Sequence, residues 1–306
     1  MANSLDEEDW EILIDSIRDN NCTPFIGAGA NAGILPVGSE IARQWAKEYK
    51  YPLNDTDDLA RVSQFLAVKR YDMFPKDRIK NQFKEVSPPD FTDPNEPHAL
   101  LADLNLPVYI TTNYDSFMYL ALKDRKHDPK RELCRWNGFV QQNMKSVFGD
   151  DKNGTDYTPT SANPLVYHLH GHYDVPQSLV LTEDDYLDFL AQISSNHSLL
   201  PPAIRTALSC TALLFIGYSL SDWNFRVLFR GLVGSLGASL GYQSVAVQLA
   251  PQPIDDSEKG RESAINYLNV YFEKIQKIRM RVYWGDIKDF TSELRQRWDK
   301  AKDDNK

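Results

Sequence analysis

The sequence predicts an α/β protein built on a doubly wound parallel sheet. Short apolar runs alternate with stretches of helical periodicity, and the runs end in glycine, asparagine or aspartate. Strands that alternate with helices are typical of a parallel sheet, because crossover helices cover both of its faces. The three cysteines, Cys22, Cys134 and Cys210, lie far apart without a CxxC pair, which excludes a four-thiolate zinc site. We therefore expect a Rossmann-like fold with helices on both faces, a smaller helical insertion and no zinc ribbon.

The first part of the chain, before residue 100, is predicted to be mostly helical, with one strand. Trp10, Leu13 and Ile17 recur at helical spacing and predict an amphipathic first helix. Ser4 or Asp6 is expected to cap its start. The next expected elements are a strand at 23–29, a helix at 38–50, and two helices at about 56–71 and 74–85 within a polar helical insertion of about 50–95.

The remaining elements continue the alternation. Residues 125–163 show little periodicity and are predicted to form a long excursion. Before this excursion we expect a helix within 98–105, a strand at 107–113 and a helix within 115–123. After it we expect a strand at 164–171, a short strand that turns into an acidic-started helix over 178–193, and a strand from 211. The last expected elements are a strand at 243–249, a helix at 258–278 and a strand at 279–286.

Composition narrows the class of protein. With 42% hydrophobic and 25% charged residues, the chain has the balance of a soluble globular protein. The formal charge of -9 disfavours a surface made to grip nucleic-acid phosphates. The acidic, helical start is unlike a secretory signal, and the apolar runs are too short to span a bilayer. Few cysteines fit a reduced compartment, so we expect a cytoplasmic protein.

The first polar turn, FIGAGANAG, places Gly27, Gly29 and Ala32 in a GxGxxA pattern after a strand. Glycines at such a turn let backbone amides approach a phosphate. Pro36 delays the next helix, and Glu48, near the offset of the ribose-binding acid of dehydrogenases, lies within a helix. The pattern therefore favours nucleotide binding without hydride transfer; a tight turn with no further role is the competing interpretation.

Two further turns offer short polar side chains at strand ends. TTNYD presents Asn113 and Asp115, which suit a ligand's amide or hydroxyls, although Asp115 is equally suited to cap the next helix. GYSLSDWN presents Ser219 and Asp222, which suit ribose and phosphate, although an ordinary capped helix start explains them as well. No GxSxG elbow is present, which excludes an α/β-hydrolase type of serine site.

The stretch LVYHLHGHYD contains three histidines, His168, His170 and His172. On one extended strand they would share a face, since side chains alternate with period two, and three imidazoles could then hold Zn²⁺ or Fe²⁺. Gly171 is expected to end the strand, which weakens the metal interpretation. An imidazole beside a glycine at a strand's carboxyl end is well placed as a general base, so His170 is the favoured catalytic residue. His168 is expected to be structural, and His172 to line the pocket mouth.

Four motifs in this order, GAGAN, TTNYD, LHG and GYSLSD, resemble the sirtuin fold over about residues 20–285. LHGHYDVPQSLVLTEDDY followed by LLFIGYSLSDWN is similar to the sirtuin-like domains of bacterial anti-phage defence systems. The resemblance implies a single NAD-binding domain over 1–306. The zinc-binding cysteines of deacetylases are missing, GILPVG replaces their Asp-Phe-Arg stretch, and TTN stands for their Thr-Gln-Asn.

The resemblance implies an NAD⁺ glycohydrolase that releases nicotinamide from ADP-ribose, as the toxic effector of abortive infection. NAD⁺ is then the substrate and no metal is expected. By the resemblance, Asn113 orients the ribose or the attacking water, His170 is the base, and Asp115 holds the nicotinamide carboxamide. The other implied NAD contacts are Gly27, Ala28 and Gly29, with amides for the pyrophosphate, and Gly217, Ser219 and Asp222 on the adenosine side. Asn31 is also expected to bind NAD.

The resemblance also implies partners. A homo-oligomer is expected, and a separate sensor, a HerA-type ATPase subunit or a short Argonaute is a candidate trigger. Direct membrane contact and strong non-specific nucleic-acid binding are not expected. Two alternative functions stay open: a non-catalytic module that reads NAD⁺ or an ADP-ribose derivative for a partner, and, less favoured, a protein deacylase.

Overall fold

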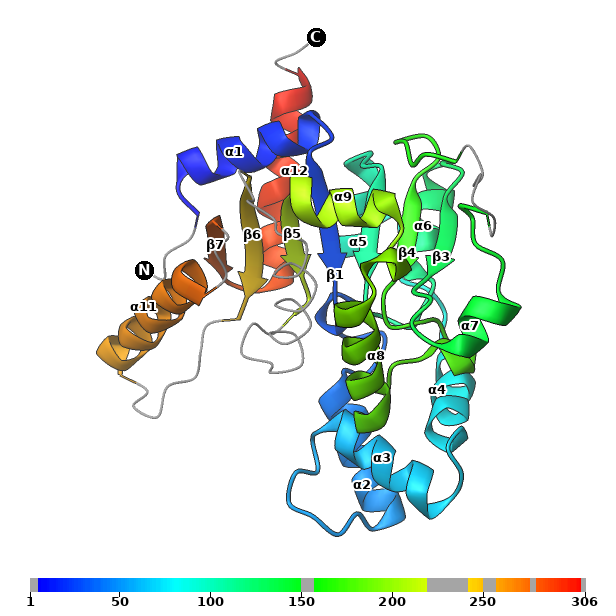
Figure 1. Cartoon of the computed structure of the whole chain (residues 1–306). Helices are drawn as coiled ribbons and strands as arrows, with labels where there is room; N and C mark the ends of the chain where they lie inside the picture. Colours follow the sequence, from blue (N-terminus) through cyan, green and yellow to red (C-terminus); the bar gives the residue numbers. More distant parts are fainter. Residues whose placement is uncertain (1–4, 150–156, 219–241, 250–256, 276–278, 304–306) are drawn as a thin grey trace.

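A seven-stranded sheet with parallel pairing between neighbouring strands forms the centre of the protein (Figure 1). The computed structural model describes residues 5–149, 157–218, 242–249, 257–275 and 279–303. The strand order is β3-β4-β2-β1-β5-β6-β7, so the chain leaves β1 in one direction and later returns to its other side. The strands are β1 (Cys22–Ile26), β2 (Val108–Thr111), β3 (Lys130–Leu133), β4 (Leu165–His168), β5 (Ala212–Ile216), β6 (Gln243–Gln248) and β7 (Arg279–Trp284).

The strand register brings the predicted turns to one edge of the sheet. Ile26 of β1 lies beside Thr111 of β2 on one side and Ile216 of β5 on the other, and Thr111 lies beside His168 of β4. Because these four residues are the last of their strands, the turns that follow them emerge side by side. Ligands of open parallel sheets bind at this edge, where the strand order reverses.

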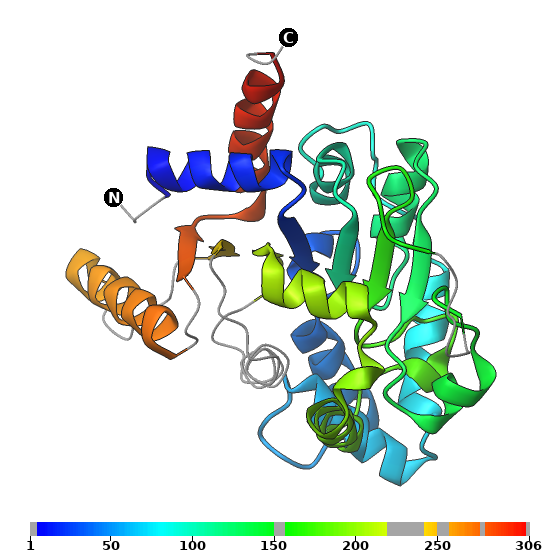
Figure 2. The same cartoon turned by 45° about the horizontal axis from the view of Figure 1, so that its top comes forward.

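Helices cover both faces of the sheet, as predicted, because each has one apolar stripe to bury (Figures 1 and 2). Trp10 and Leu13 of the first helix lie in one core with residues of α5, α6 and α12. The opposite face is covered by α8, α9 and α11. The bounds of these helices are α1 (Glu7–Arg18), α5 (Pro97–Asp103), α6 (Phe117–Asp124), α8 (Glu183–Ser195), α9 (Pro202–Cys210), α11 (Glu258–Ile275) and α12 (Ile287–Asp303).

Three helices that follow β1 form a separate layer beyond the carboxyl ends of the strands (Figure 1). They are α2 (Gly38–Tyr49), α3 (Leu59–Lys69) and α4 (Phe74–Lys84). Their apolar side chains, including Trp45 and Leu66, form a third core that also takes in Leu181 from the segment before α8. We call α2, α3 and α4 the helical module. Because it packs on the strand-end turns, it encloses the edge where a ligand is expected.

Two sequence expectations are wrong. Within 125–163, Lys130–Leu133 forms the edge strand β3 and Gly138–Asn143 forms the short helix α7, so this segment is partly built into the sheet. The expected strand at 178–182 is absent from the described sheet; Pro176–Ser178 is a 3-10 turn, and Thr182 is already the N-cap of α8. Periodicity fails in both places because the segments are short: β3 has four residues, α7 has six and the 3-10 turn has three. No helix of the described residues is long and apolar enough to cross a bilayer.

Candidate active site

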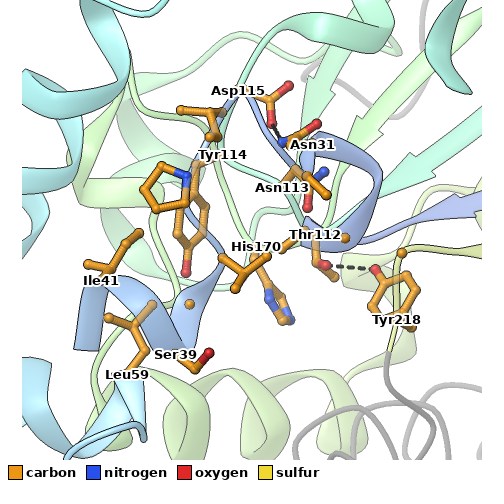
Figure 3. Close-up of a pocket in the computed structure, with 18 of the residues that line it drawn as sticks. Asn31, Ser39, Ile41, Leu59, Thr112, Asn113, Tyr114, Asp115, His170 and Tyr218 are labelled. Carbon is orange, nitrogen blue, oxygen red and sulfur yellow. Dashed lines mark hydrogen bonds between the residues drawn. The ribbon is translucent and has the colours of Figure 1, made fainter. Parts of the chain in front are cut away.

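A cavity of about 1100 Å³ lies between the strand-end turns and the helical module (Figure 3). We divide its lining into two halves by the strands that supply it. The β2–β4 half contains Asn113, Asp115 and His170, together with Asn31 from the turn after β1, which bonds Asp115. The β5–β7 half contains Gly217, Tyr218, Leu249, Asp286 and Lys288. Crossing from one half to the other passes β1, where the order of the sheet reverses. The shape suits an elongated ligand with two different ends.

Backbone hydrogen bonds join the glycine turn after β1 to the glycine turn after β5. The amide of Gly27 donates to the carbonyl of Ile216 at 2.8 Å, and that of Gly29 donates to Gly217 at 2.9 Å. A Cβ on Gly217, which has φ +80°, would lie 2.5 Å from the Gly27 carbonyl oxygen, so this close approach requires glycine. Two of the amides predicted for a pyrophosphate therefore already have acceptors. Ala28, between them, lines the cavity.

Asn113 is fixed at the end of β2. Its Nδ2 donates to the Gly27 carbonyl at 3.1 Å, and its backbone amide donates to Thr111 Oγ1 at 2.9 Å. The preceding residue, Thr112, forms a hydrogen bond of 2.6 Å between its Oγ1 and the Tyr218 hydroxyl (Figure 3). This hydrogen bond joins the two halves of the cavity. The fixed Asn113 side chain forms part of the cavity lining.

Asp115 combines a structural contact with a place in the cavity lining. Its Oδ1 accepts from the Phe117 amide at 2.8 Å, at the first residue of α6. The N-cap of α6 is Ser116, so the expectation that Asp115 caps this helix is wrong. Its Oδ2 accepts from Asn31 Nδ2 at 2.6 Å (Figure 3). A carboxylate only accepts, so Asn31 must turn its amide nitrogen to Asp115. The Asn31 Oδ1 is then left buried without a partner in the described part of the chain.

His170 lines the cavity, and its ring is packed edge-on against two aromatic residues of α8. Ring centroids lie 5.4 Å from Tyr186 and 5.3 Å from Phe189. Burial lowers the pKa of His170 to about 3, so the imidazole is uncharged at neutral pH. Its Nε2 is buried and, among the described residues, has no hydrogen-bond partner. A buried polar atom without a partner is uncommon in folded proteins and calls for an explanation such as a functional role.

The three histidines do not share a face, so the three-imidazole metal interpretation is wrong. β4 ends at His168, and Gly171 has φ +84°, which redirects the chain. The rings of His168 and His172 meet at 4.9 Å on the side of α6, whereas His170 faces α8. His172 is 1% exposed and bonds Ser116 Oγ through Nε2 at 2.9 Å, so its expected place at the pocket mouth is also wrong.

The cavity lining also contains residues that the sequence did not single out. Thr112 and Tyr218 belong to the motifs TTNYD and GYSLSDWN, so their position at strand ends could have identified them as cavity residues. Tyr186 comes from α8, and neither periodicity nor spacing ties it to the strand ends. Ser219 and Asp222, predicted for the adenosine side, lie outside the described residues. The described ranges contain no group of three or more His, Cys, Asp or Glu side chains arranged to hold a metal ion.

The fold and this site define a class: a parallel sheet with a cavity at its point of strand reversal, enclosed by a helical module. The family model of the SIR2-like domain matches residues 107–272, which include Asn113, Asp115 and His170. The chain belongs to the SIR2-like family.

Several curated relatives are similar to it. An NAD(+) hydrolase ThsA from Acinetobacter baumannii (strain 532279) is 25% identical over 71% of this chain and 41% of its own length. One of the same name from Cytobacillus dafuensis is 26% identical over 75% of this chain and 43% of its own. Defense-associated sirtuin 2 from Bacillus subtilis is 25% identical over 84% of this chain and 23% of its own. The chain spans less than half the length of these relatives.

Proposed function

We propose that this protein hydrolyses NAD⁺ to nicotinamide and ADP-ribose. The observation that carries the proposal is the β2–β4 half of the cavity, whose lining combines an uncharged imidazole with strand-end amide and carboxylate groups. The Nε2 of this imidazole has no hydrogen-bond partner among the described residues. Membership of the SIR2-like family and the similarity to relatives named NAD(+) hydrolase support it.

Asp115 and Asn31 suit the nicotinamide carboxamide. A primary amide has two N–H donors, and this corner offers a carboxylate and the buried Asn31 Oδ1 as acceptors. Because a buried acceptor without a donor is costly, a carboxamide that supplies one would bind favourably. This pairing supports the role of Asp115 and gives Asn31 a share in it.

The chemistry needs little from the protein beyond orientation. When the bond from C1′ to nicotinamide nitrogen breaks, its electron pair leaves with nicotinamide and C1′ becomes oxocarbenium-like. Water then bonds to C1′ and gives up a proton. In the proposal Asn113 orients the ribose or this water, and His170 accepts the proton and returns it to solvent. Water attacking a cationic centre loses its proton easily, so a base of low pKa suffices. An uncharged His170 also avoids repelling the cation.

The rest of NAD⁺ would run across β1 into the β5–β7 half. The turns of Gly27, Ala28 and Gly29 approach the pyrophosphate; since Gly27 and Gly29 amides donate to β5 and its turn, Ala28 is the favoured contact. Gly217, with Ser219 and Asp222 beyond the described residues, is proposed for the adenosine side.

The biological role we propose is that of a toxic effector in anti-phage defence, which depletes cytoplasmic NAD⁺ during abortive infection. Similarity to a protein named as a defence-associated sirtuin supports this role. Because unrestrained NAD⁺ cleavage is toxic, activity is expected to depend on homo-oligomerisation or on a partner such as a sensor, a HerA-type ATPase or a short Argonaute.

The test is incubation of the purified protein with NAD⁺, alone and with products of neighbouring genes, followed by chromatography. Nicotinamide and ADP-ribose in equal amounts are expected. Tight NAD⁺ binding without product under every condition would contradict hydrolysis and favour the binding module. Turnover that needs an acylated peptide and yields an acyl-ADP-ribose would indicate a deacylase.

A further inference from the structure

The first turn of α8 is acidic, and each of its three acids contacts the helical module. Arg61 Nε lies 3.2 Å from Glu183 Oε1. Gln64 and Asp184 exchange two bonds: the Gln64 side chain donates to Asp184 Oδ2 at 2.8 Å, and the Asp184 amide donates back at 3.1 Å. Acids at a helix start are expected from the helix dipole alone, but the dipole does not explain partners on another helix.

The third contact is the buried one. Lys76 Nζ of α4 lies 2.6 Å from Asp185 Oδ1, and the two side chains are only 9% and 13% exposed. The other oxygen, Asp185 Oδ2, accepts from the backbone amides of Leu181 and Thr182 at 3.1 and 2.9 Å. Two charges this far from water are tolerated only while they stay paired. The pair therefore fixes the separation of α4 from the start of α8.

The separation of α4 from the start of α8 also sets the width of the cavity, because both segments supply lining residues. Leu181 and Tyr186, on either side of Asp185 in the chain, line the cavity, and Phe83 lines it from α4. Tyr186 in turn packs against the His170 ring at a centroid distance of 5.4 Å. A shift of α8 relative to α4 would therefore move the wall that holds the imidazole.

We propose that Lys76 and Asp185 are positioning residues for the reaction: their ion pair holds α8 at the distance from α4 at which Tyr186 sets the orientation of His170. This inference rests on the proposed function for its kinetic consequence. Its structural part, that the pair fixes the segment before α8, can be measured independently.

The kinetic test compares Lys76→Met, Lys76→Met with Asp185→Asn, and Lys76→Arg. Lys84→Met, an exposed lysine on the same helix, is the matched control. In the double variant no buried charge is left unpaired and Asn still offers an acceptor to the Thr182 amide, so folding is retained. We expect its kcat to fall by about 10- to 100-fold with KM changed less than about threefold, because small misplacements of a reacting group are costly. Lys76→Arg should retain kcat within about threefold because it keeps the pair. A double variant that is folded and has the kcat of wild type would overturn the proposal.

Hydrogen exchange separates this proposal from the proposed function. The Leu181 and Thr182 amides should exchange faster in Lys76→Met and in the double variant than in wild type, and at the wild-type rate in Lys84→Met. If no form cleaves NAD⁺, the proposed function fails, and these amides still decide whether the pair fixes the segment. Unchanged exchange at both amides in both variants would contradict the positioning role.

Discussion

The two halves of the cavity differ in how deeply their polar groups are buried. In the β2–β4 half, Asn31, Asn113, Asp115 and His170 are all 7% exposed or less. In the β5–β7 half the charged residues at the start of α12, Asp286 and Lys288, are exposed, and the apolar Leu249 of the same half is 74% exposed. Buried dipoles act strongly on a ligand and cannot reorient, whereas an open rim contributes contact area. We therefore expect the first half to govern kcat and the second to govern KM.

The largest effect is expected from His170→Ala. Removing the imidazole takes away the proposed proton acceptor and opens the wall beside Tyr186, so nicotinamide release should fall by about 100-fold or more, the scale of a lost general base. Steady-state kinetics measure this. His127→Ala, which removes a histidine outside the cavity lining, is the control. Wild-type kcat in His170→Ala would remove this residue from the mechanism.

A second prediction tests what holds His170 in place. Gly171 has φ +84°, and a Cβ there would lie 2.3 Å from the Ser178 carbonyl oxygen. Gly33 has the same φ with nothing within 4 Å, so it provides a matched control. Gly33→Ala should cost about 1 kcal/mol for the left-handed backbone alone, and Gly171→Ala about 2 to 4 kcal/mol because a clash is added. Denaturant unfolding measures both; equal losses would show that the clash is relieved at no cost.

A smaller effect is expected where the halves meet. Tyr218→Phe removes the hydroxyl that contacts Thr112 at 2.6 Å and donates to the Ile26 carbonyl at 3.0 Å, and it leaves the ring on Phe25 and Phe215. We expect KM to rise by about three- to tenfold, within the scale of the two lost hydrogen bonds, with kcat nearly unchanged. Initial rates over a range of NAD⁺ concentrations test this. A loss confined to kcat would argue against the division into a catalytic and a binding half.

The weakest dependence is that of activity on pH. Since the pKa of His170 is about 3, its protonation should leave kcat/KM flat from pH 5 to 8. A wild-type inflection near pH 6.5 that is missing in His170→Ala would contradict the buried, uncharged imidazole.

Stability should respond to pH in a defined direction. Burial lowers the pKa of His168 and His170 to about 3, whereas the pKa of a histidine in an unfolded chain is near its ordinary value of 6.5. Between these values the unfolded chain binds more protons, so the free energy of unfolding should fall as pH falls from 6.5 toward 3. Above pH 6.5 these groups should have no effect. Thermal melts across this range test the direction.

Sequence reasoning was strongest where a strand ends in a turn. The parallel sheet and its helices are confirmed because apolar runs and helical periodicity report burial directly. Asn113, Asp115 and His170 lie together because the register aligns β2 with β4, although their roles remain proposals. The position of His172 relative to His168 and His170 depends on the φ of Gly171, and spacing does not encode that angle. Contacts such as Lys76 with Asp185 join segments 109 residues apart and leave no local pattern.

The most direct test of the claim that this cavity hydrolyses NAD⁺ compares wild type with Asn113→Ala. Nicotinamide release and ADP-ribose binding are measured on the same preparation of each protein, in the presence of the candidate partner from a neighbouring gene. Asn143→Ala, an exposed asparagine, is the control. We predict turnover by wild type and the control, a loss of about 100-fold or more in Asn113→Ala, and ADP-ribose affinity within about threefold in all three. Equal nicotinamide release by wild type and Asn113→Ala would contradict the account.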